Sequence, residues 1–239
     1  MIADKDRSGF FGASDSKIIM GNWRTKTFAE WWQVKLGVLQ KPGFTTRAMA
    51  AGSAYEHRIL DALEIKDRDR QVIMPELRLR VNLDGETEDT IKEVKTTGKE
   101  PEVSKAYWYQ AQVEMYATGK KLDMVFYKMT DAEYENFFLP IDKDRVTIIP
   151  ISYDEKWVHD EYLPRLKYLS YCLDHRFTPR LEEFNAGKWI NPFDFRRWTS
   201  RYADYVRLVL RRICVSVLRQ IERLQDKRRD KKVQTETFT

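Results

Sequence analysis

Two acidic residues and a lysine fall close together near the middle of the chain. Asp84 stands at an Asp-Gly step, and Glu93 and Lys95 follow it as the ends of a Glu-x-Lys triplet. Side chains two positions apart on a β-strand point to the same face, so the Glu93 carboxylate and the Lys95 ammonium are expected to project together. Asp-Gly is a strong signal for a tight turn. We therefore expect residues 76–83 to pair with residues 90–96, which brings Asp84 beside Glu93.

These residue types suit the metal-assisted hydrolysis of a phosphodiester. Mg²⁺ prefers oxygen ligands and is held by one or two carboxylates together with water and substrate phosphate oxygens. A lysine beside the ion can orient the attacking water and stabilise charge that develops on the phosphate. Each element also has an ordinary explanation, because Asp-Gly is first a turn and Glu-x-Lys is common where 33% of the residues are charged. Their order and spacing together favour a nuclease centre.

Other polar residues flank this group. Glu56 falls on a predicted helix face that is otherwise apolar or small, where an acid needs a partner or a metal. A position at the exposed edge of the helix is the alternative. Gln110 and Gln112 interrupt an aromatic helical run and, being two apart, do not share a helix face. Solvent exposure is the usual position of a helical glutamine, but we expect one of the two to hold phosphate or water.

The N-terminal segment offers a possible anion site. Ser14 or Asp15 is a suitable N-cap for a short helix. Free N–H groups at a helix start favour phosphate, and Arg7 lies just upstream to add charge. A plain helix cap explains the same residues, and on the local pattern alone it is the simpler interpretation.

The composition excludes several classes of protein. With 239 residues the chain is expected to form one domain, or one domain with an appendage. Cys172 and Cys214 are too few and too distant for a disulfide framework or a metal knuckle, which fits a reducing cytoplasm. The three histidines are scattered, which excludes a His-Glu-x-x-His zinc site. No run of 18 apolar residues predicts a membrane span, and the N-terminus lacks the apolar core of a signal peptide.

Positive charge is concentrated at the C-terminal end. Residues 200–239 contain 11 Lys or Arg against 5 Asp or Glu, a net of +6, whereas residues 1–199 contain 31 against 32, a net of −1. We expect the basic segment to be a helix up to about residue 225 followed by a disordered tail. A basic helix on a near-neutral body can bind a polyanion, pack on the domain or pair with another subunit.

The hydrophobic patterns predict a mixture of helices and strands. Besides the paired strands around Asp84, the expected helices cover residues 27–36, 46–63, 104–118 and 153–173, the last interrupted at Pro164, and the expected strands cover residues 123–129, 136–141 and 146–152. Ser104 is the expected cap of the helix that carries the glutamines. No internal repeat is evident.

Several segments resemble the PD-(D/E)xK nucleases and, among them, the phage recombination exonucleases of the lambda-exonuclease and YqaJ type. The resemblance covers most of residues 7–119. It lies in the opening block GASDSKIIMGNW with WWQVKLG, the helix MAAGSAYE, the Asp-Gly step, the Glu-x-Lys triplet and the Tyr-x-x-Gln-x-Gln helix. The family's usual Pro before Asp-Gly is Leu83 here, and Thr96-Thr97 replaces its frequent Cys-Pro.

The resemblance implies roles for particular residues. They are Glu56, Asp84, Glu93 and the Val94 carbonyl as ligands of Mg²⁺ or Mn²⁺, Lys95 and Gln110 as catalytic groups, Arg7 and Ser14 as holders of the 5′ phosphate, and Tyr107 and Gln112 as further DNA contacts. It also implies an α/β fold with a central mixed sheet of about five strands flanked by helices and a C-terminal helical extension. Residues 1–199 would form the nuclease domain and residues 200–239 the extension.

The activity implied is degradation of one strand of duplex DNA from its 5′ end. Relatives of this type often form ring-shaped trimers and work beside a single-strand annealing protein. Two alternatives remain at this stage. One is an endonuclease or a single-strand-directed nuclease of the same superfamily. The other is a DNA-end-binding module without catalysis.

Overall fold

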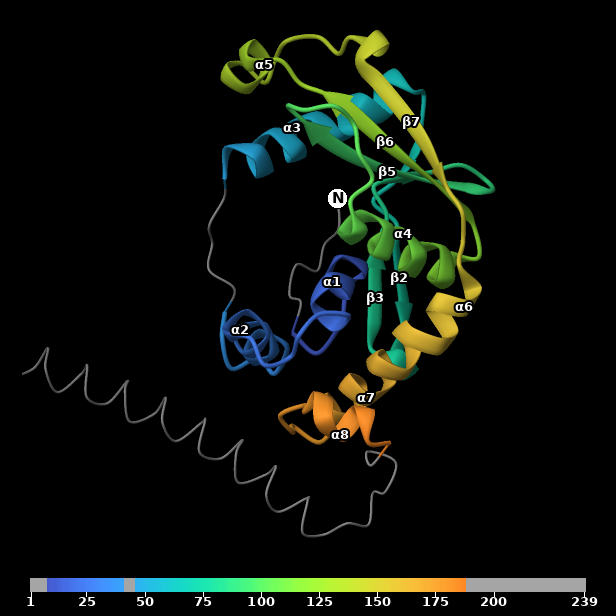
Figure 1. Cartoon of the computed structure of the whole chain (residues 1–239). Coiled ribbons are helices and arrows are strands. Elements are labelled where there is room, and N and C mark those ends of the chain that lie inside the picture. Colours follow the sequence, from blue (N-terminus) through green and yellow to red (C-terminus); the bar gives the residue numbers. More distant parts are fainter. Residues whose placement is uncertain (1–7, 41–45, 188–239) are drawn as a thin grey trace, which may run out of the picture.

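The computed structural model of the protein describes residues 8–40 and 46–187. Their centre is a mixed five-stranded sheet in the order β1-β4-β5-β6-β7, with helices on both faces (Figure 1). The strands of this sheet are β1 (Asp67–Arg68), β4 (Gly85–Glu86), β5 (Thr90–Thr97), β6 (Lys121–Lys128) and β7 (Val146–Ile151). A separate two-stranded sheet pairs β2 (Gln71–Met74) with β3 (Leu79–Asn82). The predicted α/β fold with about five strands is confirmed.

The helices follow the sequence pattern closely. They are α1 (Ser16–Ile19), α2 (Lys26–Lys35), α3 (Arg47–Ala62), α4 (Lys105–Thr118), α5 (Asp131–Glu135), α6 (Glu155–Trp157), α7 (Leu163–Asp174) and α8 (Leu181–Asn185), with 3-10 turns at η1 (Ala13–Asp15), η2 (Pro75–Leu77) and η3 (Lys143–Arg145) and a π-helical turn at η4 (Val158–Tyr162). Thr25, Thr46 and Ser104 cap α2, α3 and α4 with their hydroxyl oxygens, as expected at helix starts. The predicted interruption near Pro164 is the π-helical turn, which ends where the proline enters the first turn of α7.

The sheet separates two hydrophobic cores. On one face of the sheet, Val94, Val125 and Tyr127 pack with the apolar side of α3. The residues between them on β5 and β6 point the other way, toward α4 and α7. Each residue of β5 is thus committed to one face by strand alternation.

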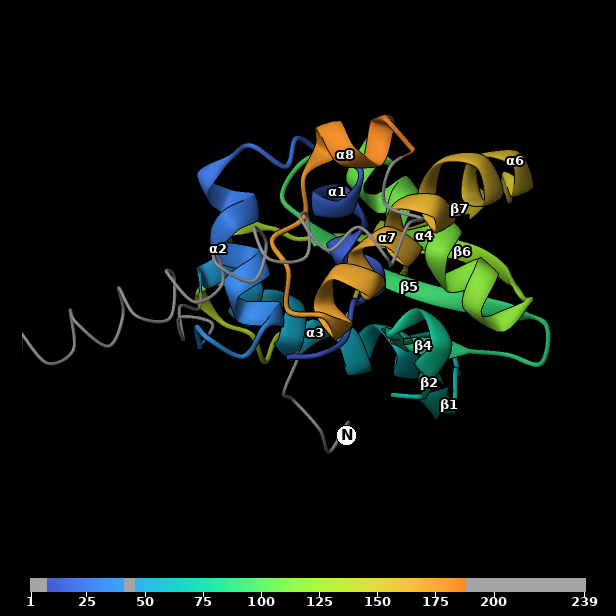
Figure 2. The same cartoon turned by 90° about the horizontal axis from the view of Figure 1, so that it is seen from below.

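The N-terminal helices close one end of the larger core against the last helices. Figure 2 shows α1 and α2 beside α7 and α8. The indole N–H of Trp32 donates to the carbonyl oxygen of Phe177 at 3.0 Å, and the rings of Trp23 and Tyr168 stack at 5.7 Å. The aromatic residues of α2 are therefore core residues.

The predicted hairpin around Asp84 is wrong, because the two predicted strands do not pair with each other. Residues 79–82 form β3 and pair with β2, not with β5. The partner of β5 is the short strand β4, with Gly85 opposite Lys92. Gly85 serves close packing here, because a Cβ at this position would lie 2.8 Å from Cδ2 of Leu60 on α3. The turn falls later, where the Thr87 N–H donates to the Thr90 carbonyl oxygen at 2.8 Å.

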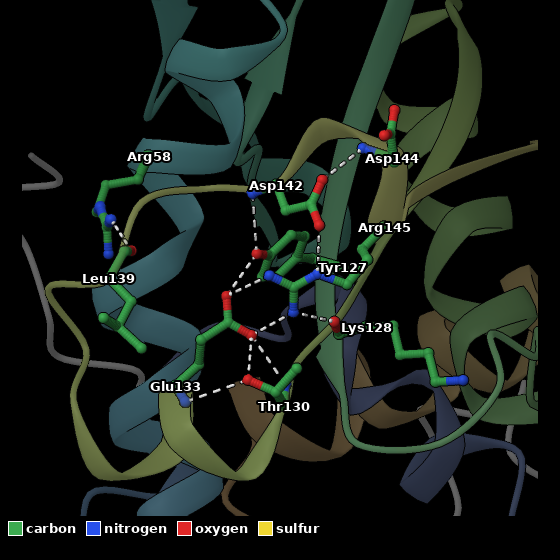
Figure 3. A network of polar contacts seen from close by, with 9 residues as sticks. All are labelled: Arg58, Tyr127, Lys128, Thr130, Glu133, Leu139, Asp142, Asp144 and Arg145. Atoms are coloured by element: carbon green, nitrogen blue, oxygen red, sulfur yellow. Dashed lines mark hydrogen bonds and ion pairs between the residues drawn. The ribbon is translucent and has the colours of Figure 1, made fainter.

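The strand expected over residues 136–141 is also wrong, because this segment is a loop. Arg58 of α3 donates to the carbonyl oxygens of Phe137 and Leu139, so a side chain satisfies backbone groups that a neighbouring strand would otherwise pair. Figure 3 shows the contact with Leu139. Phe137 packs on the α3 core, whereas Phe138 is 92% exposed. The apolar run reflects loop packing and not sheet pairing.

Some expectations lie outside the described residues. These are the role of Arg7, the end of the predicted nuclease domain and the basic helix and tail of residues 200–239. Among the helices that the structure describes, none combines the length and the apolar character needed to cross a bilayer.

Candidate active site

Strand β5 presents Glu93 and Lys95 toward α4, as strand alternation requires. The Glu93 side chain is 2% exposed, and the Lys95 ammonium forms an ion pair with its Oε1 atom. The same ammonium lies 5.4 Å from the centre of the Tyr107 ring on α4, within range of a cation–π contact. The predicted pairing of carboxylate and amine on one strand face is thus present.

Asp84 joins this pair through the backbone of β5. Its Oδ2 atom accepts the N–H of Val94 at 2.9 Å, and its own carbonyl oxygen accepts the N–H of Asp69 at 3.3 Å. Asp84 directly precedes β4, so the antiparallel pairing of β4 with β5 delivers it to Glu93. The expected neighbourhood forms by a different strand pairing from the one predicted.

Glu56 reaches the site from α3. Burial raises the pKa of its carboxyl group, and the negative charge of Glu93 raises it further. One ligand atom each of Glu56, His57 and Asp69 also lies within 4.8 Å of the others. Glu56 is therefore half-buried among charged groups and is not at a free edge of the helix.

Helix α4 adds Gln110 and an acid that the sequence analysis did not single out. The Gln110 Nε2 atom donates to Glu93 Oε1 at 2.5 Å and to Glu114 Oε1 at 2.8 Å. Glu114 is completely buried. A signal for it existed, because Glu114 follows Gln110 by one helical turn and is the charged residue of an apolar run.

The site holds more negative charge than its lysine can balance. Burial, followed by the charge of Glu93, raises the pKa of Asp84 and of Glu114 well above the usual range. Burial alone would lower the pKa of Lys95, but the carboxylates of Glu93 and Asp84 raise it. Such an imbalance in a dry environment is costly, and a divalent cation would relieve it.

A buried oxygen atom of Glu93 supports the fit of a metal ion. Oε2 of Glu93 has no hydrogen-bond partner among residues 8–40 and 46–187. Buried carboxylate oxygens are normally paired, and an oxygen left free in an acidic cluster suits a hard cation. The unpaired Oε2 atom of Glu93 therefore suits a divalent cation, whereas the ligand atom of Glu56 groups with those of His57 and Asp69.

Gln112 points away from this cluster. It is completely buried, its Nε2 atom donates to the Ser152 carbonyl oxygen at 2.9 Å, and its Oε1 atom accepts the Asp154 N–H at 2.7 Å. The two glutamines indeed use different helix faces, but both bind protein groups. Gln112 ties α4 to the end of β7, and we do not retain it as a DNA contact.

The predicted phosphate site is only partly described. Ser14 is exposed on η1, and Arg7 is outside the described residues. Of the two cap candidates, Asp15 is committed to the fold, because it accepts the Gly12 N–H at 2.8 Å and pairs with the Lys35 ammonium at 2.6 Å. The Ser14 hydroxyl remains accessible to solvent.

The protein is similar in fold to solved structures that are named as exonucleases. The alkaline exonuclease LHK-Exo from Laribacter hongkongensis matches with a TM-score of 0.52 at 18% identity, over 84% of this chain and 96% of that one. LHK-Exo in complex with dAMP matches with a TM-score of 0.52 at 20% identity, over 76% and 93%. A phage-related exonuclease from Haemophilus somnus 129PT matches with a TM-score of 0.46 at 13% identity, over 70% and 96%.

By sequence, the chain matches no family profile and no curated protein. The structural similarity is to LHK-Exo over nearly the whole of that enzyme. The resemblance inferred from the motifs is therefore confirmed at the level of the fold.

Proposed function

We propose that the protein is a metal-dependent exonuclease that degrades one strand of duplex DNA from the 5′ end and leaves 3′ overhangs for phage-type recombination. The observation that carries this proposal is the convergence of Asp84, directly before β4, with Glu93 and Lys95 of β5. Fold similarity alone does not give function, but the fold together with this set of groups supports phosphodiester hydrolysis.

The metal ion would be Mg²⁺, with Mn²⁺ as a substitute. Glu56, Asp84 and Glu93, with the Val94 carbonyl oxygen, are the proposed ligands. When bound, such an ion activates water and polarises the scissile phosphate. Lys95 orients the water and stabilises negative charge on the phosphate, a task favoured by its raised pKa, which keeps it protonated.

The proposed substrate is a duplex DNA end. Arg7 and Ser14 would hold its 5′ phosphate, and Tyr107, beside Lys95, would contact the strand being cut. The dAMP bound by LHK-Exo supports a deoxynucleotide site on this fold. We further propose a cytoplasmic homo-oligomer, a trimer by resemblance, that acts with a single-strand annealing protein.

The proposal is tested by removing the Lys95 ammonium. In Lys95→Ala we expect no cleavage of a linear duplex in Mg²⁺, while binding of the duplex persists. Lys92→Ala is the matched control, because Lys92 is on the same strand but pairs with Asp123 at 2.5 Å. Duplex labelled at either end, digested with Mg²⁺ or with EDTA, reports polarity and metal dependence. Full activity of Lys95→Ala would contradict the mechanism.

Two outcomes would favour the alternatives. Cutting of closed circular DNA would indicate an endonuclease of the same superfamily. Calorimetry that shows no Mg²⁺ or Mn²⁺ binding would support a DNA-end-binding module without catalysis.

A further inference from the structure

A single amide group links two buried acids in this site. Gln110 Nε2 lies 2.5 Å from Glu93 Oε1 and 2.8 Å from Glu114 Oε1. A glutamine amide has two N–H donors on its nitrogen and accepts only through its oxygen. Both donors are therefore used by the two acids.

This geometry determines which way the amide faces. If the amide were turned over, its oxygen would lie against two carboxyl oxygens. Glu93 Oε1 is a carboxylate oxygen that accepts from the ammonium of Lys95, so it would repel the amide oxygen and offers it no donor. With the nitrogen held by both acids, the Gln110 Oε1 atom is directed away from them as an available acceptor.

Glu114 is a costly residue for simple packing. It is completely buried, its Oε2 atom has no hydrogen-bond partner within the described part of the chain, and it lies in a run with Val113 and Met115. An apolar residue of the same size would fill the position at lower cost, since burying an unpaired polar atom is unfavourable. Its one described side-chain contact is the Gln110 amide.

We propose that Glu114 is a positioning residue, which holds the Gln110 amide so that its carbonyl oxygen faces the reacting groups and accepts a hydrogen bond from the attacking water. This inference rests on the proposed function. Glu114 acts through Gln110 and touches neither substrate nor metal.

Three variants test the role by kinetics. Glu114→Met keeps the volume but removes the acceptor, and we expect kcat to fall about 10- to 100-fold, as for loss of a partner that orients a catalytic group, with KM little changed. Glu114→Gln keeps an acceptor oxygen and is expected to restore kcat to within about threefold of the parent. In the Gln110→Ala background, Glu114→Met should cause no further loss, because the amide it positions is gone.

A measurement independent of activity accompanies the kinetics. With ¹⁵N-glutamine labelling, the side-chain pair that disappears in Gln110→Ala identifies Gln110. In the parent protein both of its N–H protons should exchange slowly with water, and one should become fast in Glu114→Met.

Unchanged kcat in Glu114→Met, additive losses in the double variant, or rapid exchange of both protons in the parent would each overturn the inference. Hydrogen exchange of the two Gln110 side-chain protons in the parent protein tests the inference even if Glu114→Met does not fold. If the parent cleaves no DNA but both protons are protected, the proposed function fails while the positioning of Gln110 stands.

Discussion

Two regions of this protein bury acidic residues, and they treat them in opposite ways. At one end of the sheet, Glu133 of α5 is surrounded by donors (Figure 3). On the central strand β5, Glu93 shares the Gln110 amide with Glu114, and one of its oxygens has no hydrogen-bond partner in the part of the chain that the structure describes. The two regions show how the same side chain serves the fold in one place and chemistry in another.

Every oxygen of the Glu133 carboxylate has partners. Arg145 donates to both oxygens, the Tyr127 hydroxyl donates to Oε1 at 2.6 Å, and the Thr130 N–H donates to Oε2 at 2.8 Å in a capping box. Burial would raise the pKa of Glu133, but these donors, led by Arg145, lower it to about 2. The group is ionised, paired and saturated, so it stabilises the loop that follows α5.

The β5 region shows the reverse. Asp84 and Glu114 have raised pKa values because burial and the charge of Glu93 disfavour their ionised forms. One ammonium, that of Lys95, serves the cluster through its ion pair with Glu93. A fold does not need such an arrangement, and buried groups with perturbed pKa values and unpaired oxygens mark a site that awaits a ligand.

The largest expected effect is a contrast between two glutamate-to-glutamine substitutions, of which one lowers activity and the other lowers stability. Glu93→Gln should lower kcat by about a thousandfold, because a lost metal ligand costs several kcal/mol of transition-state stabilisation and about 1.36 kcal/mol corresponds to tenfold. Glu133→Gln should leave cleavage per folded molecule unchanged but lower the free energy of unfolding by about 3 kcal/mol, since Arg145 loses the more buried of its two charged partners. Duplex digestion and urea unfolding measure the two effects, and equal phenotypes would end the distinction.

A divalent cation should stabilise the protein through the acids around β5 and not through Glu133. Mg²⁺ at 100 times its dissociation constant is expected to raise the free energy of unfolding by about 2.7 kcal/mol, because it binds the folded state alone. Asp84→Asn should lose most of this gain, whereas Glu133→Gln should keep it. Urea midpoints in Mg²⁺ and in EDTA give the comparison. An undiminished gain in Asp84→Asn would place the ion elsewhere.

The smallest effect is the pH dependence of stability in EDTA. Glu114 holds its proton more tightly folded than unfolded, so the folded state binds more protons above the usual pKa of 4.5, and its contribution to stability falls as pH rises. Glu133 behaves oppositely, since its stabilisation is complete above 4.5 and is lost as pH falls toward about 2. Glu114→Gln and Glu133→Gln should each remove that residue's contribution to the slope of unfolding free energy against pH, which is at most about 1.4 kcal/mol per pH unit. Unfolding curves from pH 3 to 8 decide, and identical slopes in the two variants would contradict the assignment.

Local sequence patterns predicted much of the fold and part of the candidate site. The hydroxyl caps of α3 and α4 and the break at Pro164 are local in sequence and were predicted. Glu93 and Lys95 share a face because strand alternation is a property of the chain itself. Glu114 was detectable in principle, one turn beyond Gln110, but a lone acid in an apolar run carries no sign of its partner.

Contacts between residues far apart in the chain were not predicted from these local patterns. The Asp-Gly step reads as a turn, yet Gly85 is required by the side chain of Leu60, which the sequence places 25 positions away. The apolar run of residues 136–141 predicted a strand, yet Arg58 binds the carbonyl oxygens of Phe137 and Leu139. In both cases a distant side chain decided the conformation.

The sequence by itself determined which chemical groups the protein carries and which of them share a helix or strand face, because these follow from residue type and from the period of regular backbone. Only the tertiary structure decided which strand brings Asp84 to Glu93 and that Gln110 lies between two acids. It also decided that the Glu133 carboxylate is fully paired with donors, whereas the acids around β5 are not. Those outcomes depend on burial and on contacts between residues far apart in the chain, and both arise when the sheet, α3 and α4 pack together.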